Sequence, residues 1–581
     1  MIAFGAAERR RTLVVALLFA ALTALFAWPL SARPADRVMS ASPDTNLFMW
    51  TLAWDVHAFT HQPLDLFDAN IYYPLRRTLA YSENLVGSAI VAAPILWTTG
   101  NPVLAMNLVA LLAAAMCGVG AYALARQVGL APAAAIVSGL VFAFSPPRFL
   151  RLDQLHLATM QWVPFGLASL HAYLDGGRPF DLRLAAAFFT LQALTSGHGA
   201  VFLASAMLAL VTFEIVVKKS AKTAEAAEKG LALRSPRSPR SPGTIVRDFG
   251  ITGFLLLAPA VLSFVPYVMV QREAGLRRTL ENWTVSPASY LASPAQVHRW
   301  LLSFAPAARI NERADAYLFP GVLPLVLAAC ALTRVRRRET RFYALLTLVS
   351  VWLTLGPPIG LWPLVYWLPG LNFIRAPSRF MLLAILGLAI LSGFGLERVV
   401  RSRFRVFVCS WLHVDRWLAA VVAALLALEF AAFPLGVEPY RVEIPAIDRW
   451  LASQPKPFVV AEVPLPRSTD LGAWERRHTA FMLHSTAHWQ KTVHGYSGLR
   501  LPLHAALYDA LQRFPDEQSL ASLEQLDVTY VVVHGGWLGP GDRAELDARL
   551  ARFGDRLRLE HAEGEGRVYA VVSASTRTGS R

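Results

Sequence analysis

The chain has 581 residues, of which 55% are hydrophobic and only 16% are charged, and its mean hydropathy is +0.41. These values exclude an ordinary soluble domain and indicate a polytopic membrane protein. The net charge of +15 does not indicate nucleic-acid binding, because many of the basic residues gather in short runs between apolar segments, at 218–247, 334–341 and 401–403.

The chain begins with a basic stretch, Arg9–Arg11, followed by an apolar segment from Thr12 to Leu30. The small residues of SARPA after it would suit a signal-peptide cleavage site, but the apolar segment is longer than the core of an ordinary signal peptide. We therefore expect an uncleaved anchor. The three cysteines, at 117, 330 and 409, form no CxxC pair and predict neither a disulfide framework nor a metal cluster.

Eleven segments are apolar enough to be read as membrane-spanning helices. They are residues 12–30, 103–125, 131–147, 158–175, 184–197, 199–217, 249–270, 318–333, 341–356, 376–396 and 417–435. With the N-terminus inside, Lys and Arg are denser in the cytoplasmic connections than in the outer ones, as the positive-inside rule requires, and the C-terminus lies outside.

Several segments are predicted not to span. Residues 86–98 are apolar but short and contain Pro94, so we expect an interfacial or re-entrant helix on the outer side, and we expect residues 357–368 to lie in the outer interface. The sequence RSPRSPRSP makes the loop 218–247 a disordered cytoplasmic linker.

The predicted organisation is a transmembrane domain over residues 1–435, with a long first outer loop at 31–85, and an extracytoplasmic α/β domain over 436–581. In the second domain the patterns at 458–465, 528–534 and 567–572 predict strands, whereas 503–514 and 520–526 predict helices.

Ionisable side chains near the outer ends of spans are candidates for function, because such groups are costly in a bilayer. Asp44 follows Pro43 just beyond the first span and could serve as a general base toward an acceptor hydroxyl. The alternative is that Ser42 or Asp44 caps an ordinary helix. For Glu83, in YSENL before an apolar helix, a catalytic and a capping role compete equally.

Cationic candidates lie on the same side. Arg148, Arg151 and His156 stand between the third and fourth spans, His198 lies in the SGHG turn between the fifth and sixth, and Arg375 and Arg379 precede the tenth. Guanidinium groups near the membrane surface suit a lipid-linked phosphate. Interfacial anchoring is the favoured alternative for Arg148 and Arg151 and is equally open for Arg375 and Arg379. Pro377 should keep Arg375 out of the helix.

Other chemistries are poorly supported. The sequence has no dinucleotide or Walker loop and no HExxH, and GYSGL at 495–499 has its serine one position away from a nucleophile elbow. Histidines at 478, 484, 488 and 494 include a weak i, i+4 pair at His484 and His488, but we expect structural or surface histidines and no metal site there.

Together, the first outer loop opening with an aspartate, the many spans and the outer α/β domain resemble the GT-C superfamily of membrane glycosyltransferases, within it bacterial proteins of the YfhO-like and mannosyltransferase-like groups. The residues that carry the resemblance are SPDTNLFMW, LFDANIYYP, YSENL, FAFSPPRFLRLDQLHL, NFIRAPSRF and LDVTYVVVH. In protein mannosyltransferases the first loop carries adjacent Asp-Glu, whereas Thr45 follows Asp44 here, which leaves the acceptor open.

The resemblance implies a multi-pass protein of the bacterial inner membrane that moves a sugar from a polyprenyl-phosphate donor to an envelope glycan, lipid or protein. Transfer would occur on the outer face, with inversion and with Asp44 as general base, and neither a cofactor nor an obligatory metal is expected. Two alternatives remain: a transporter or flippase of a lipid-linked saccharide, for which no internal repeat is found, and a non-catalytic assembly factor.

Overall fold

The computed structural model describes residues 6–572 except for 228–241, 275–284, 304–316, 402–413 and the single positions 334, 336, 357, 369, 468 and 500. By internal contacts the chain forms two compact units. The membrane unit comprises Met1–Arg33, Asn107–Val265 and Arg272–Val437, and the loop-and-sheet unit comprises Pro34–Met106, Pro266–Gln271 and Glu438–Arg581. The boundary predicted at 435/436 stays a prediction.

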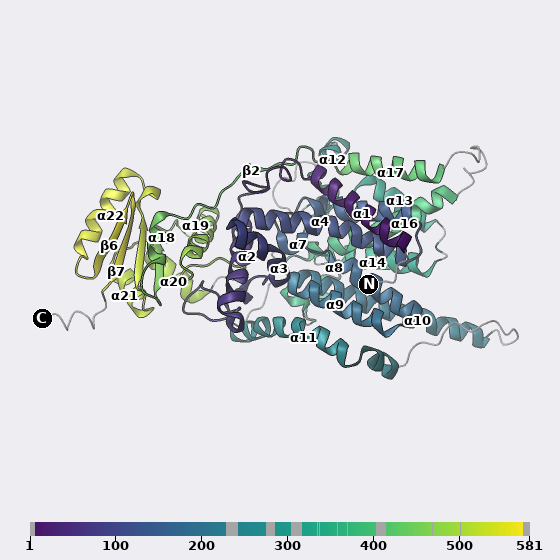
Figure 1. The fold of residues 1–581 in the computed structure, drawn as a ribbon, viewed down its shortest axis with the longest axis horizontal. Coiled ribbons are helices and arrows are strands. Elements are labelled where there is room, and N and C mark those ends of the chain that lie inside the picture. The colour runs from purple at the N-terminus through teal and green to yellow at the C-terminus, as the bar shows by residue number, and fades with distance from the viewer. Residues whose placement is uncertain are drawn as a thin grey trace. The chain divides into compact units, whose positions relative to one another are not determined.

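Each of the eleven apolar segments contains a helix (Figure 1). These helices are α1 (Ala6–Phe26), α4 (Pro102–Gln127), α5 (Pro132–Phe144), α8 (Trp162–Gly176), α9 (Pro179–Thr195), α10 (Gly197–Ala227), α11 (Pro242–Ala274), α13 (Val322–Leu332), α14 (Arg338–Thr354), α16 (Met381–Arg401) and α17 (Val414–Phe430). Shorter helices α6 (Pro146–Phe149), α7 (Leu155–Ala158), α12 (Gln296–Leu301) and α15 (Trp362–Val365) connect them.

Four of the described helices are long and apolar enough to cross a membrane, in the segments Pro102–Gln127, Gly197–Val217, Gly243–Glu273 and Pro377–Arg401. The number of spans therefore stays a prediction, although the helical character of all eleven segments is confirmed. Residues 228–241 of the expected disordered linker lie outside the described part of the chain, whereas its two ends continue α10 and α11.

Helix α16 is the centre of the membrane unit. All its residues from Met381 to Glu397 are buried, and it packs against α5, α13 and α14. A Cβ atom at Gly395 would lie 1.8 Å from the carbonyl oxygen of Leu327, so only glycine permits this approach of α16 to α13. In contrast, α11 exposes Ile251, Phe254 and Leu255, as expected for a helix that faces lipid.

In the loop-and-sheet unit, the first outer loop forms α2 (Pro43–His61) and α3 (Val86–Thr99), with short turns η1 (Pro63–Asp65) and η2 (Thr78–Tyr81) between them. The segment expected to be an interfacial or re-entrant helix is thus helical, with Pro94 inside it. Strand β1 (Arg37–Val38) pairs with β2 (Glu438–Pro439). The loop is therefore joined to the C-terminal part of the chain.

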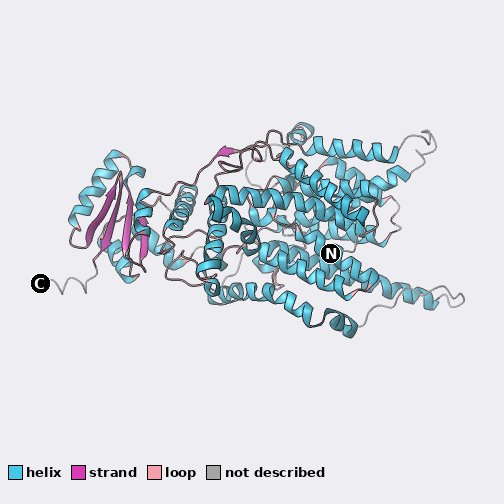
Figure 2. Cartoon of the chain, viewed as in Figure 1, coloured by secondary structure: helices cyan, strands magenta, loops and turns pink. Residues whose placement is uncertain are grey.

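The C-terminal part is built on a five-stranded sheet (Figure 2) of order β4-β3-β5-β7-β6. Its strands are β3 (Val459–Val463), β4 (Lys491–Thr492), β5 (Tyr530–His534), β6 (Leu557–Glu563) and β7 (Gly566–Val571), and its helices are α18 (Ala446–Ala452), α19 (Leu471–His484), α20 (Pro502–Leu511), α21 (Glu517–Gln525) and α22 (Pro540–Arg552). Strands β4, β3 and β5 run parallel, and β7 and β6 continue the sheet antiparallel.

The predicted α/β character is confirmed, and all three predicted strands and both helices are present. The alternation of side chains along β3 and β5 builds two apolar cores. Ala461 and Val463 belong to one, whereas Val460 and Val532 pack with Ile447 of α18 in the other. The even-numbered residues of these strands thus share the face that α18 covers.

Candidate functional site

Asp44 lies in the first turn of α2. Asp44 is not the N-cap of this helix, because the side chain of Ser42 caps it by accepting a hydrogen bond from the Thr45 amide (3.2 Å). The half-buried Asp44 carboxylate instead accepts a hydrogen bond at Oδ1 from the hydroxyl of Tyr496 (3.1 Å). The carboxylate therefore lies at the N-terminal end of α2, where the helix dipole is positive.

Glu83 is half-buried and does not cap α3. Leu85, the residue directly before α3, has a left-handed backbone conformation. The amide of Val86, the first residue of α3, donates to the side chain of Asn84 (3.2 Å). The Asn84 amide in turn donates to the hydroxyl of Tyr267 (3.2 Å), which donates to the Ser82 carbonyl (2.9 Å). Glu83 is thus adjacent to a fixed polar network, and its own role stays a prediction.

Arg148 is buried in the membrane unit, with 1% of its surface exposed. Its guanidinium donates to the carbonyl oxygens of Ala143 (2.7 Å) and Ala158 (3.1 Å) and to Cys117 Sγ (2.6 Å), and it lies over the Phe142 ring. These contacts hold the end of α5 against the end of α7. Arg148 therefore has a structural role in this conformation.

Arg151 is also buried. Its Nε donates to the Pro147 carbonyl (2.9 Å), and one terminal nitrogen donates to the Gln154 side chain (3.3 Å). The segment that carries both arginines is therefore held by side-chain to main-chain hydrogen bonds, the kind of partner that buried donors require.

Three of the predicted cationic residues meet at the start of α10. Arg379, 8% exposed, donates from a terminal nitrogen to Nε2 of His198 (2.9 Å), and the rings of His198 and His156 lie 5.1 Å apart. Because guanidinium groups only donate hydrogen bonds, His198 Nε2 is the acceptor in this contact. We call Arg379, His198 and His156 the cationic centre.

The SGHG turn positions this centre. Helix α9 ends at Thr195 and α10 starts at Gly197, so the tight turn predicted there is present. The Ser196 hydroxyl donates to the His156 carbonyl (2.6 Å) and accepts from the Gly199 amide (3.1 Å), which caps α10 and fixes His156 beside it. A helix N-terminus with an arginine beside it favours an anion.

Arg375 stays outside the helix, as Pro377 predicts. It lies between the short turns η6 (Leu371–Phe373) and η7 (Pro377–Phe380) and is half-buried, whereas Arg379 belongs to η7 directly before α16. The two arginines therefore do not share a helical face.

The sequence analysis did not single out two groups of buried polar residues. Asp55 on α2 is 0% exposed and neither carboxylate oxygen finds a hydrogen-bond donor among the described residues, so burial raises the pKa of this carboxyl well above its ordinary value. In the C-terminal part, Glu462, His484 and His534 converge. His488 is not a partner of His484, because its Nδ1 accepts from the Gln490 amide (3.0 Å).

Comparison with known proteins identifies the fold. No protein-family model and no curated protein sequence matches the chain. The mycobacterial arabinofuranosyltransferase AftD is similar in structure, with a TM-score of 0.58 and 15% identity over 98% of this chain, and a mutant form of AftD gives 0.60 and 17% over 97%. The chain spans 40% and 42% of the length of those proteins.

A crystal structure of ArnT from Cupriavidus metallidurans bound to undecaprenyl phosphate gives a lower TM-score of 0.48 with 13% identity, over 98% of this chain and 99% of that one. At such identities a structural match establishes the fold alone. The chain therefore has the fold of the GT-C membrane glycosyltransferases, and the resemblance found in its sequence is confirmed at that level.

Proposed function

We propose that the chain is a glycosyltransferase of the bacterial inner membrane, with its N-terminus cytoplasmic and its C-terminal domain outside. It transfers a sugar from a polyprenyl-phosphate donor to an envelope glycan, lipid or protein on the outer face. The observation that carries this proposal is the structural similarity to an arabinofuranosyltransferase over nearly the whole chain. Fold alone does not define a reaction, so the proposal also rests on the residues below.

Asp44 is the proposed general base. The hydroxyl of Tyr496 and the first turn of α2 hold the carboxylate, while Oδ2 accepts no hydrogen bond from the described residues. That oxygen can accept the proton of an acceptor hydroxyl, which makes the hydroxyl a better nucleophile. Glu83 is the proposed second carboxylate of the site.

The cationic centre is the proposed binding site of the donor phosphate, with Arg375 and Arg151 as further contributors. Arg379 supplies charge, and the capped start of α10 adds the partial positive charge of its peptide groups. Ring nitrogens of His198 and His156 can donate hydrogen bonds to phosphate oxygens. Arg148 stabilises the segment that carries His156 by donating hydrogen bonds to the carbonyl oxygens of Ala143 and Ala158.

The proposed reaction is a direct displacement with inversion. The acceptor oxygen attacks the anomeric carbon, the bond from that carbon to the phosphate oxygen breaks, and Asp44 takes the acceptor proton. The leaving polyprenyl phosphate carries the electron pair, and the charge that develops on it is stabilised by the cationic centre. Basic side chains supply this stabilisation, so no metal is required in the step.

The test is a transfer assay with purified chain and a panel of polyprenyl-phosphate sugars, with Asp44→Asn beside the wild type. Asparagine keeps the shape but removes the base, so transfer should fall about 10²–10⁴-fold while expression and insertion stay normal. Asp65→Asn, an exposed residue of the same loop, is the matched control. Full transfer by Asp44→Asn would refute the assignment.

The same assay separates the alternatives. A transporter or flippase of a lipid-linked saccharide would move labelled donor across proteoliposomes without forming product. A non-catalytic assembly factor would do neither, and Asp44 could be replaced without loss in cells.

A further inference from the structure

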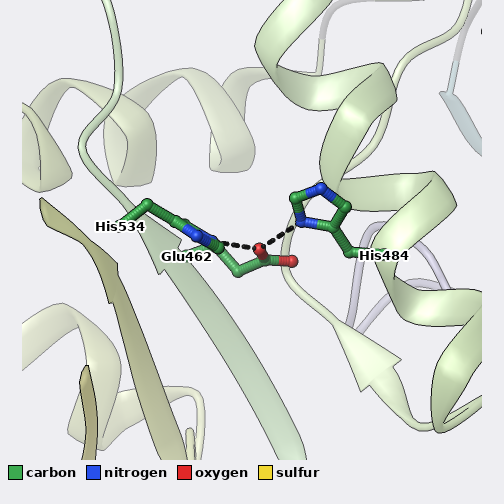
Figure 3. Close-up of side chains that lie close together, drawn as sticks. All are labelled: Glu462, His484 and His534. Atoms are coloured by element: carbon green, nitrogen blue, oxygen red, sulfur yellow. Dashed lines mark hydrogen bonds and ion pairs between the residues drawn. The ribbon is translucent and has the colours of Figure 1, made fainter. Parts of the chain in front are cut away.

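Three side chains with metal-ligating atoms meet inside the C-terminal part of the chain. Glu462 comes from β3, His534 ends β5, and His484 lies in the last turn of α19. Figure 3 shows both imidazole rings directed at one carboxylate oxygen, Glu462 Oε2, which lies 2.7 Å from His534 Nε2 and 3.2 Å from His484 Nδ1. The three ligand atoms lie within 4.8 Å of one another.

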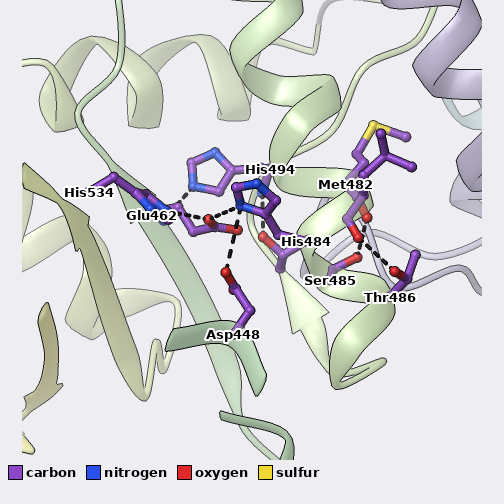
Figure 4. A network of polar contacts seen from close by, with 10 residues as sticks. Asp448, Glu462, Met482, His484, Ser485, Thr486, His494 and His534 are labelled. Atoms are coloured by element: carbon purple, nitrogen blue, oxygen red, sulfur yellow. Dashed lines mark hydrogen bonds and ion pairs between the residues drawn. The ribbon is translucent and has the colours of Figure 1, made fainter. Parts of the chain in front are cut away.

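A second carboxylate completes the cluster. Asp448 of α18 directs Oδ2 toward His484 Nδ1 at 3.7 Å, as Figure 4 shows. The side chains of Asp448 and Glu462 are 0% and 1% exposed, and those of both histidines 7%. Neither oxygen of Asp448, nor Oε1 of Glu462, has a hydrogen-bond donor among the described residues.

The fold explains why these residues converge. Glu462 and His534 are even-numbered residues of neighbouring parallel strands, with Glu462 paired in register with Val532, so both lie on the face that α18 covers. Asp448 is on that helix, and α19 presents its C-terminal end to the same place. Three separate elements therefore contribute one ligand atom each, and α18 brings the Asp448 carboxylate beside them.

Two adjacent carboxylates buried from water are costly unless cations neutralise them. Asp448 and Glu462 are both buried beside the imidazoles, and Glu462 Oε1 has no hydrogen-bond donor among the described residues. A divalent cation would neutralise the Glu462 carboxylate and take one nitrogen lone pair from each imidazole.

The spacing fits a tetrahedral ion. Bonds of about 2.0–2.2 Å from zinc to nitrogen and oxygen place neighbouring ligand atoms roughly 3.4 Å apart. Glu462 Oε2 lies 2.7 Å and 3.2 Å from the two imidazole nitrogens, and all three ligand atoms lie within 4.8 Å of one another, so small side-chain shifts would seat one ion among them. Two imidazoles favour zinc over calcium or magnesium, which prefer oxygen ligands alone.

We propose that Glu462, His484 and His534 bind one zinc ion, which joins β3, α19 and β5 and stabilises the C-terminal part of the chain. Asp448 of α18, whose carboxylate lies 3.7 Å from His484 Nδ1, is a neighbouring carboxylate that supports the site. The sequence analysis expected no metal among the histidines of this region, and the proposal departs from that expectation.

Surrounding side chains hold the ligands in place, as in metal centres generally. The Trp537 ring stacks on the His534 imidazole with centroids 4.2 Å apart, and the Arg477 guanidinium lies 3.6 Å from the Trp537 centroid. The Glu462 amide donates to Nε2 of His494 (2.6 Å). His494 is thus a supporting residue, because its Nε2 is already occupied.

The test measures metal in the full chain, purified in detergent through a tag without histidine. Elemental analysis should find one zinc per chain in the wild type, and background levels in His534→Gln and His484→Gln. His504→Gln, a buried histidine whose ring contacts the Tyr73 carbonyl instead, should keep its zinc. Cobalt added to the chelated wild type should give the intense visible bands of a tetrahedral site.

Two outcomes would overturn the proposal. The first is a monodisperse wild type, expressed with added zinc, that holds no metal and takes up no cobalt. The second is undiminished zinc in both ligand variants. If the variants do not fold, the chelated wild type decides, because its unfolding temperature should rise on addition of zinc alone. None of these readouts depends on glycosyl transfer.

Discussion

Replacement of Arg148 by methionine tests whether this arginine is structural or binds substrate. Methionine keeps most of the side-chain length and the apolar contact with Phe142 but removes the donors to the carbonyl oxygens of Ala143 and Ala158. Each of these hydrogen bonds from a charged donor contributes about 1.5–3 kcal/mol. Both acceptors are buried, so we expect a loss of about 3–6 kcal/mol.

At roughly 2 °C per kcal/mol for a large domain, this loss corresponds to a fall of about 6–12 °C in unfolding temperature. The assay is the fraction of monodisperse protein that survives heating in detergent. Arg178→Met, at an exposed arginine of the same unit, is the control and should change little. An unchanged unfolding temperature together with a raised KM for the donor would refute the structural role and make Arg148 a phosphate ligand.

Two further predictions concern single side chains. Arg379→Met should raise the KM for the donor about 10–100-fold, because one charged hydrogen bond to phosphate is lost, and should leave the KM for the acceptor unchanged. Equal effects on both KM values would show that Arg379 only positions His198. Burial lowers the pKa of His504 to about 4, so its contribution to stability is present above the unfolded pKa and is lost as the pH falls toward 4. Between pH 7 and pH 5 the free energy of unfolding should fall by about 2 kcal/mol more in the wild type than in His504→Gln, as denaturation at the two pH values would measure. Equal falls would contradict the neutral, buried ring.

The helical segments could be predicted because apolar runs of sufficient length have one stable form in a bilayer. The same holds for local signals: Pro377 kept Arg375 outside α16, and the SGHG sequence produced a tight turn before α10. Strands β3, β5 and β7 were recognised from short runs of β-branched residues. Helices α19 and α22 were missed, because they are amphipathic and rich in charged residues.

The side-chain partners could not be predicted. Asp44 and Tyr496 are 452 positions apart, and nothing in the sequence near either residue indicates that they meet. Nothing in the sequence indicated that the guanidinium groups of Arg148 and Arg151 would donate to carbonyl oxygens at the ends of α5 and α6.

The sequence by itself determined that the chain is a membrane protein with a C-terminal α/β part, because hydropathy and strand patterns depend only on neighbours along the chain. It also indicated the cationic residues that surround α10. Only the tertiary structure decided that Asp448, Glu462, His484 and His534 form one buried cluster, since no spacing along the chain marks them as neighbours. Their convergence results from the parallel pairing of β3 with β5 and from the packing of α18 and α19 against one face, which are properties of the folded sheet.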